Sequence, residues 1–578
     1  MKKIYYMIAA AALLLTSCDD FLNRSSKSSI SSDNVFESKD LAEGVVIGVY
    51  ANLAYDYNAY DRVFFDAYAS PLDALTRPTY LAGNIQSNNS MFLTYWKRFY
   101  EGINRANDVI NNISRTPDMS EELKGQRIAE CKFLRAWHYY RLNCLWRGVP
   151  IYLENLAPQE YTRPRDTEEK VWRQIISDCT DCIGCEAIPD KYAADSPDYG
   201  RITRGAAYAL RGKVYMWLKD WPAAEADFKK VGECGYGLYT AGSYASLFKE
   251  ENERCAEMVF SAQMVETANS GNCMSFIYGN FNTAGYGNNR IVANAKFIDS
   301  YEFADGKPFS WDDVIPGYSE TDSDARSIYF CRDAMTDSEK LNMATAGADL
   351  SLYLTDGNED RIRRAFENRD PRLKANFILP YSTYLGGSTG KAETYTMRFP
   401  YRSDVAPYYD LKAYNTTQML YLLRKFVAEG TKYKNISYNP VDMPLIRYAD
   451  VLLSLAEAVN EQGGRTSEAV GYVNQVRQRA GVRALGTNEY TQVTDQENLR
   501  ERIRNEKKWE LVGENQLYCE ELRWGSWDRD KFSDGNGLLQ CWGSAVHYYK
   551  YGGDHYYRWP IPRSEIEKAG LTQNEKWF

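Results

Sequence analysis

The chain has 578 residues, enough for a large core or several domains, and its formal charge at neutral pH is −9. An acidic chain is a poor partner for nucleic acid or anionic lipid, so we expect no nucleic-acid partner. Its three histidines are poor material for histidine-based catalysis or a zinc site, and we expect no metal and no cofactor. The 46 Tyr, 22 Phe and 13 Trp exceed what a helical core needs and are a first indication of ligand chemistry.

Residues 1–17 have the three parts of a lipoprotein signal peptide. Lys2 and Lys3 form a positive n-region, Met7 to Leu15 an apolar run too short to span a bilayer, and "LTS" leads into Cys18. We therefore expect cleavage before Cys18 and lipidation of its thiol, the alternative being an ordinary signal with a coincidental cysteine. Residues 18–32 are Ser-rich and read as a lipidated flexible tether, so the lipid anchor is the only membrane contact that we predict.

Residues 33–235 are predicted to be an N-terminal helical part. Apolar residues recur at helical spacing in 40–55, 95–113 and 123–148. At 203–235 two helices meet at Asp220-Trp221-Pro222, with small and large residues alternating as in a tetratricopeptide (TPR) hairpin. Such hairpins cannot bury their faces alone, so we expect them to stack.

The run "SDCTDCIGCE" places Cys179, Cys182 and Cys185 at a spacing that suggests an iron–sulfur loop. The fourth Cys and its Pro are missing, and the preceding residues have helical periodicity. Three ligands along one helix cannot surround a metal, so we favour a structural or incidental role. Beyond Cys18 the number of cysteines is odd, and a disulfide framework is not expected to organise the fold.

Residues 236–440 are richer in Gly, Asn, Tyr, Ser and Thr and lose helical periodicity, while β-like runs appear ("EMVFSAQ", "ETYTMRF", "LYLLRKF"). We predict an irregular ligand-binding insert here. Residues 441–578 form a C-terminal helical part, with a second TPR-like hairpin at 447–481 that turns at Gly463-Gly464. The predicted fold is mostly α, with stacked TPR-like helical hairpins and a long irregular insert containing short β-strands.

Glu506, Glu510 and Glu514 fall on the helical stripe set by Leu499 and Ile503, so they should point inward. A general acid/base pair is one interpretation. We favour buried carboxylates paired with arginines such as Arg477, Arg447 or Arg523, because a buried charge must be paired.

Two segments, 61–96 and 276–290, alternate aromatic residues with Asn, Asp, Gly and Arg outside any helical period. That mixture suits sugars, since an aromatic ring stacks on the C–H face of a pyranose while amides and carboxylates bind its hydroxyls. Ordinary packing of Tyr-rich loops is an equally good explanation of each segment.

Six ordered blocks together resemble the SusD/RagB family of surface glycan-binding lipoproteins. They are "CDDFLN" at the start, "FLRAWHYYRL…WRGVPIY" (133–152), "RDPRL" (369–373), "PLIRYADVLLSLAEAVNEQG" with "VNQVRQRAG", "NEKKWELVGENQLYCEELRWG" (505–525) and "RWPIPRSEIEKAGLTQNEKWF" (558–578). The likeness spans nearly the whole mature chain. Lys507, Leu517 and Glu520-Glu521 depart from the family pattern, which puts in doubt which ion pairs form there.

The resemblance implies a non-enzymatic protein on the extracellular side of the outer membrane. Such proteins act as a lid on a SusC-like TonB-dependent transporter, capture oligo- or polysaccharide and hand it inward. The family's aromatic sugar platform implies, by position, the glycan-binding residues Asp73, Arg77, Trp96, Tyr286, Asn288 and Trp311. A peptide-capturing lid, a protein-interaction adaptor and a glycoside hydrolase remain as alternatives.

Overall fold

The computed structural model describes residues 34–57, 65–268, 270–405, 409–433, 435, 437–533 and 535–577. The predicted signal peptide, Cys18 and the tether lie outside the described residues. Within these ranges no helix combines the length and the apolar character that a membrane span requires.

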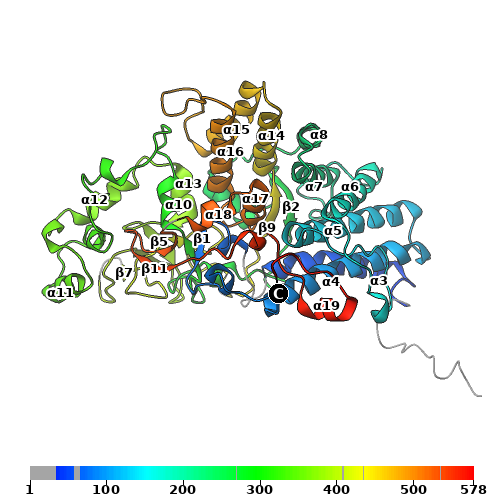
Figure 1. The fold of residues 1–578 in the computed structure, drawn as a ribbon, viewed down its shortest axis with the longest axis horizontal. Helices are drawn as coiled ribbons and strands as arrows, with labels where there is room; N and C mark the ends of the chain where they lie inside the picture. The colour runs from blue at the N-terminus through cyan, green and yellow to red at the C-terminus, as the bar shows by residue number, and fades with distance from the viewer. Residues whose placement is uncertain are drawn as a thin grey trace, which may run out of the picture.

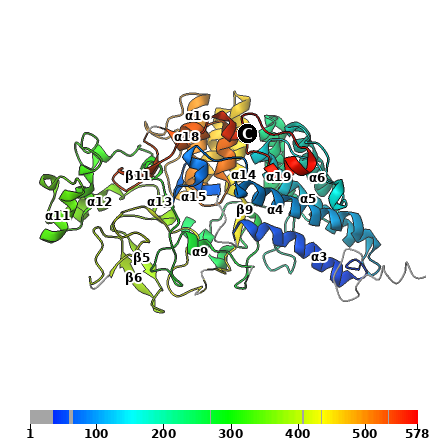
Figure 2. The same ribbon diagram turned by 60° about the horizontal axis from the view of Figure 1, so that its bottom comes forward.

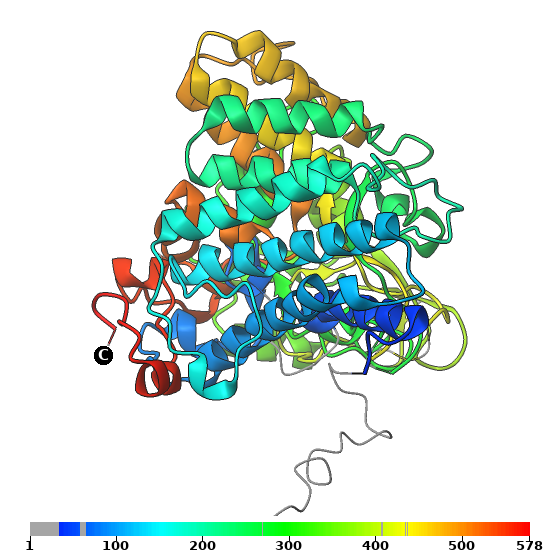
Figure 3. The ribbon, with the colours of Figure 1, turned by 90° about the vertical axis from the view of Figure 1, so that its right-hand side faces the viewer.

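Helices that follow one another along the chain form a stack on one side of the molecule (Figure 3). They are α3 (Lys39–Ala51), α4 (Ser90–Asn112), α5 (Glu121–Trp146), α6 (Glu168–Gly184), α7 (Arg204–Trp217) and α8 (Trp221–Glu233). Each begins at a side chain that accepts a hydrogen bond from a backbone N–H of the first turn, at Ser38, Asn89, Ser120, Thr167, Thr203 and Asp220. These caps satisfy otherwise unpaired donors, so the local sequence sets where each helix starts.

The stack continues through a second hairpin that is distant in sequence. Helix α14 (Tyr448–Gln462) packs against α8 and pairs with α15 (Thr466–Ala480) and α16 (Gln496–Leu511). Figure 1 shows α14, α15 and α16 standing beside α7 and α8. The predicted helical fold with two TPR-like hairpins is confirmed, and the two hairpins lie next to each other in space.

The remaining helices are short: α9 (Met274–Ile277), α10 (Ala295–Ser300), α11 (Asp337–Thr345), α12 (Asn358–Ala365), α13 (Pro371–Asn376), α17 (Leu517–Trp524), α18 (Trp527–Phe532) and α19 (Arg563–Ala569). Helices α11 and α12 lie at the end of the molecule opposite α3 to α6 (Figures 1 and 2).

The described strands form small sheets. The antiparallel pairs are β1 (Leu72–Ala74) with β3 (Ile291–Ala293), β2 (Met258–Ala262) with β9 (Met443–Arg447), β4 (Phe377–Ile378) with β8 (Leu422–Leu423), β5 (Thr383–Gly386) with β6 (Glu393–Thr396), and β10 (Gly537–Leu539) with β11 (Ala545–Tyr548). Strand β7 (Tyr409–Asp410) runs parallel to β6. The three β-like runs of the sequence correspond to β2, β6 and β8. Because β2 pairs with β9, the irregular region is tied directly to the C-terminal helices.

The cysteine run behaves as a helix rather than as a cluster loop. Cys179 and Cys182 are buried on α6, and Cys185 caps its C-terminal end. Among the described residues no group of His, Cys, Asp or Glu has the arrangement of a metal site. The described cysteines are free thiols.

Candidate functional site

Asp73, predicted to contact glycan, is fully buried and joins three segments of the chain. Its carboxylate accepts hydrogen bonds from Lys531 Nζ at 2.9 Å, Tyr549 Oη at 3.0 Å and Asn294 Nδ2 at 2.9 Å. These contacts hold β1 against α18 and the end of the β10–β11 hairpin. Asp73 therefore supports the surrounding loops.

Trp96 and Trp311 are also inside the protein. Trp96 lies on the buried face of α4, with its ring 5.3 Å from that of Trp146. Trp311 stacks on Tyr318 at 4.9 Å and donates from Nε1 to Asp299 at 3.1 Å. Neither ring has the exposed face that stacking on a sugar requires.

The first aromatic segment contributes largely to the core. Tyr68, Tyr80 and Tyr95 are each at most 3% exposed and pack around Trp559. The sugar-binding interpretation of this segment is therefore not supported for these rings. Arg77 differs, because its side chain reaches the surface.

Arg77, Tyr286 and Asn288 lie on neighbouring loops outside the helical stack. With three further aromatic residues they define a region that we call the loop surface: Arg77, Phe281, Tyr286, Asn288, Tyr414 and Tyr548. Its rings are accessible, with exposed fractions of 60% for Tyr286, 57% for Tyr414 and 58% for Tyr548. Nearby strands β5 and β11 lie in the half of the molecule away from α4 to α6 (Figure 2).

Backbone hydrogen bonds hold these loops together. Leu75 N donates to Arg290 O at 2.8 Å, which continues the β1–β3 pairing toward Arg77. Arg77 Nη1 donates to Tyr548 O at 3.3 Å. Asn288 N donates to Phe276 O at 2.7 Å and so fixes the turn that carries Tyr286.

Asparagine side chains join the third loop to the others. Asn289 Oδ1 accepts from Tyr414 N at 2.7 Å, and Asn282 Oδ1 accepts from Lys412 N at 2.6 Å. As a result the Phe281 and Tyr414 rings lie 5.8 Å apart. Asn282 and Asn289 therefore hold the loops together and so position the exposed rings.

A cavity of about 410 Å³ is lined in part by residues that follow Tyr414 and by the turn of the hairpin that carries Tyr548. Its walls include the rings of Phe399, Tyr401 and Trp542, together with Thr416, Thr417, Asn342 and Gln540. Thr416 follows Tyr414 closely in the chain, and Trp542 lies in the turn between β10 and β11, so both flanking segments also reach the loop surface. Gln540 Oε1 is buried and has no hydrogen-bond partner among the described residues. The cavity thus combines apolar rings with hydroxyl and amide groups.

The sequence interpretation did not select Tyr414, Tyr548 or Trp542. For Tyr414 and Tyr548 the signal was present, since "LKAYNTT" and "HYYKYGGDHYY" mix aromatic and polar residues without helical spacing, as 276–290 does. What the sequence lacks is their proximity, because 286, 414 and 548 are far apart along the chain.

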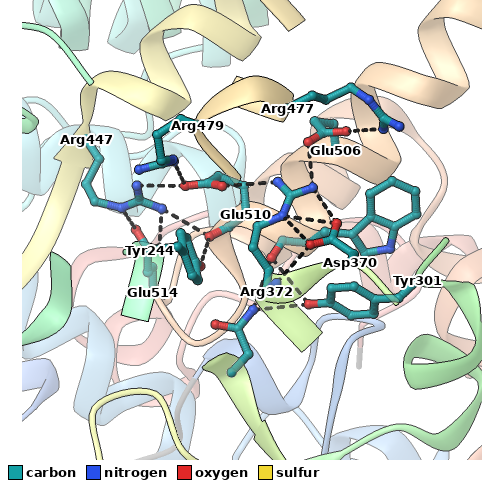
Figure 4. Close-up of polar contacts among 12 residues, drawn as sticks. Tyr244, Tyr301, Asp370, Arg372, Arg447, Arg477, Arg479, Glu506, Glu510 and Glu514 are labelled. Carbon is teal, nitrogen blue, oxygen red and sulfur yellow. Dashed lines mark hydrogen bonds and ion pairs between the residues drawn. The ribbon is translucent and has the colours of Figure 1, made fainter. Parts of the chain in front are cut away.

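The acid/base interpretation of α16 is not supported. Glu506, Glu510 and Glu514 are all buried, and the close-up in Figure 4 shows each of them directed at arginines. Arg477 Nη1 donates to Glu506 at 2.9 Å, and Arg447 donates to Glu510 at 2.9 Å and to Glu514 at 2.8 Å. The predicted inward orientation and pairing with Arg477 and Arg447 are confirmed, whereas Arg523 pairs instead with Glu457 and Glu520.

The electrostatics of this network oppose proton transfer. Burial alone would raise the pKa of Glu510, but Arg479, Arg447 and Arg372 hold that pKa well below its ordinary range. A general acid needs a proton near neutral pH and access to its substrate. Glu510 has neither.

Comparisons with known proteins identify the family. The model of the SusD family matches residues 256–577, and a second model, described as starch-binding and associating with the outer membrane, matches residues 20–216. The chain belongs to the SusD family.

Other SusD proteins are similar to this chain over most of its length. SusD-like protein P25 of Formosa agariphila is 25% identical over 543 residues, covering 90% of each chain. Starch-binding protein SusD of Bacteroides thetaiotaomicron is 24% identical over 485 residues, covering 80% of this chain and 75% of the other. A SusD-like protein of Bacteroides fragilis has the same fold, with a TM-score of 0.71, 22% identity and coverage of 95% and 99%.

The SusD family consists of non-catalytic glycan-binding proteins of polysaccharide-utilisation systems. The chain is accordingly a SusD-like glycan-binding protein associated with the outer membrane, and not an enzyme. This agrees with the family resemblance inferred from the sequence blocks.

Proposed function

We propose that the protein binds oligo- or polysaccharide at the loop surface and the adjoining 410 Å³ cavity and delivers it to a SusC-like TonB-dependent transporter. The observation that carries this proposal is the exposure of the rings of Tyr286, Tyr414 and Tyr548 on loops that hydrogen bonds hold together. Aromatic faces suit the C–H faces of pyranoses, and the hydroxyl and amide groups of the cavity suit sugar hydroxyls.

Of the six residues predicted from the sequence, Arg77, Tyr286 and Asn288 keep the role of ligand contacts in this proposal. Asp73, Trp96 and Trp311 are buried, so they are not ligand contacts in this proposal; Trp96 packs within the helical stack. Each contact on an open surface is weak, so we expect dissociation constants between micromolar and millimolar, or about −8 to −4 kcal/mol.

The test is affinity electrophoresis against a panel of neutral polysaccharides. We expect retardation of the wild type by at least one glycan and its loss in the variant Tyr286→Ala/Tyr414→Ala/Tyr548→Ala. Tyr490→Ala, which removes a 37% exposed tyrosine elsewhere on the surface, is the matched control and should bind normally. If the wild type bound no glycan, or if the triple variant bound as well as wild type, the proposal would be wrong.

The same experiment distinguishes the alternatives. Capture of peptides without binding of any glycan would favour a peptide-capturing lid or an adaptor. Release of shorter products from a bound glycan would indicate a glycoside hydrolase, and we expect none.

We assign the helical stack to the transporter, since α4 to α6 lie away from β11, the strand that carries Tyr548 (Figures 1 and 2). Helix α3 exposes Leu41 and Ile47 there, at 45% and 52%. Co-purification of a TonB-dependent transporter with the full-length protein from outer membranes tests the partnership, and its absence under conditions that retain glycan binding would contradict it.

A further inference from the structure

A second and larger cavity, of about 640 Å³, lies elsewhere in the irregular region. Residues 248–251, helix α13, strand β4 and the segment 424–433 surround it. It shares no lining residue with the loop surface or with the 410 Å³ cavity. Its volume falls in the range of about 300–1,000 Å³ that is usual for ligand pockets.

The lining of this cavity is positive although the whole chain is negative. Five basic residues line it (Lys249, Lys374, Arg424, Lys425 and Lys432), against three acidic ones (Glu250, Glu251 and Glu429). The formal charge of the lining is therefore 5 − 3 = +2, compared with −9 for the chain. Partly enclosed charge of one sign attracts ligands of the opposite sign.

The three acidic residues are paired with lining cations. Lys432 Nζ lies 3.5 Å from Glu250 and 3.6 Å from Glu251, and Arg424 Nη1 lies 2.6 Å from Glu429. Glu250 and Glu251 share one lysine, so these pairs leave one acidic charge against the three remaining lysines.

The ammonium group of Lys425 is already paired inside the protein. It is buried, and its Nζ lies 2.6 Å from Glu514 of the charged network. Burial lowers the pKa of Lys425 to about 8, even though Glu514 favours its charged form.

Lys249 and Lys374 are the remaining lysines of the lining. Lys249 is partly exposed and Lys374 exposed. Within the part of the chain that the structure describes, neither side chain takes part in an ion pair or hydrogen bond. Two ammonium groups are thus available to a ligand in one cavity.

Apolar groups form the other wall. The rings of Phe248 and Phe426 meet edge to face at 5.3 Å, beside Leu379 and Val427. Phe426 and Tyr433 have left-handed backbones, with φ of 62° and 54°, which residues other than glycine rarely adopt. Such strain persists where the surrounding fold imposes it and is concentrated at ligand sites.

We infer that this cavity is a second binding site, specific for an anionic sugar unit. Lys249 and Lys374 bind its carboxylate or sulfate group, and the Phe426 and Tyr433 wall contacts its ring. The glycan nature of the ligand rests on the proposed function, while its negative charge rests on the lining of the cavity. Carboxylate and sulfate share the recognised chemistry, so separate probes distinguish a uronic acid from a sulfated sugar.

Isothermal titration calorimetry with trigalacturonate, a sulfated carrageenan tetrasaccharide and a neutral galactose trimer tests the inference. We expect wild-type protein to bind at least one of the two anionic probes. The variant Lys249→Ala/Lys374→Ala should weaken that binding by about tenfold or more. Raising NaCl from about 50 to about 300 mM should also weaken it, because the two ammonium groups are accessible to solvent ions.

The matched control is Lys97→Ala/Lys568→Ala, which removes two exposed lysines away from the cavity and should bind as wild type does. Failure of both anionic probes to bind, or equal binding by the Lys249/Lys374 variant, would overturn the inference. If only the Tyr286/Tyr414/Tyr548 variant lost binding of the anionic probes, the ligand would lie on the loop surface. That result would also overturn the inference of a second site, but it would leave the proposed function intact. Failure of the proposed function is distinguished by the neutral polysaccharide panel, which the lysine variant should bind normally.

Discussion

Asp66 is a buried carboxyl whose ionisation the fold resists. It is 2% exposed, and its Oδ2 accepts hydrogen bonds from Asn515 N at 2.7 Å and Tyr278 Oη at 3.4 Å. Burial raises the pKa of Asp66 to about 7, and these hydrogen bonds only partly oppose the change. The folded protein therefore holds a proton that the unfolded chain releases at lower pH.

Asp66→Asn should remove a pH dependence of stability. The contribution of the bound proton is fully present below the unfolded pKa of 3.8 and is lost as pH rises through about 7. Between pH 4 and pH 8 we expect the wild type to lose about 2–4 kcal/mol of unfolding free energy relative to Asp66→Asn. Urea unfolding at several pH values measures this difference, with the exposed Asp356→Asn as control. Parallel pH profiles of Asp66→Asn and wild type would contradict the prediction.

The predicted glycan contacts differ in whether the sequence alone shows that they are buried. Trp96 shares a helical stripe with Phe92, Phe99 and Ile103, so its burial follows from spacing alone. Asp73 and Trp311 lie in segments without a long period. For them only the tertiary contacts decide that they face inward, as only those contacts bring Tyr286 near Tyr414.

Among the elements, α7 and α8 show how a TPR-like hairpin depends on one small residue. A Cβ atom on Gly212 of α7 would lie 2.7 Å from the ring of Phe228 on α8. Phe228 is 1% exposed and has little room to move. Glycine therefore sets the close approach of the two helices.

Gly212→Ala should destabilise the protein by about 1–3 kcal/mol, because overpacking outweighs the better helix propensity of alanine. Gly471→Ala is the matched control, since a Cβ on this residue of α15 meets nothing within 4 Å. It should stabilise by about 0.5–1 kcal/mol. Thermal or urea unfolding compares the two, and a stabilising effect at both positions would refute the packing argument.

Helix α16 was the element best predicted in its orientation. Leu499, Ile503, Glu506 and Glu510 share one stripe of the helix, Glu514 lies just beyond its end at Leu511, and all five are buried. The helix itself does not specify the partners of these glutamates, because Arg447 and Arg477 come from other elements and Arg372 from the irregular region. A carboxylate stripe predicts that cations are needed but not which ones supply them.

For the whole molecule, membrane attachment is predicted from the N-terminal signal and not from the fold. Cys18 lies outside the described residues, so lipidation remains a prediction from the sequence. Cys18→Ala should abolish incorporation of labelled palmitate and release the protein from the outer membrane, while glycan binding by the purified protein stays unchanged. Continued labelling of the variant would contradict the assignment.

The helices form one continuous stack, although they are not all consecutive in the sequence. Residues 236–440 separate the two TPR-like hairpins, yet α8 and α14 pack directly together. Hairpins bury their faces only against neighbours, so the second hairpin completes the surface that the first leaves open. Strand β9 leads into α14 and pairs with β2, and this pairing attaches the irregular region to the helical stack.

Helix positions, caps, the two hairpins and the inward stripe of α16 were determined by the sequence, because these features depend on periodicity and on neighbouring residues. Tertiary structure alone decided which loop rings are exposed, where the cavities lie and which arginine meets which glutamate. In irregular segments no period specifies a buried face, so packing between distant residues determines it.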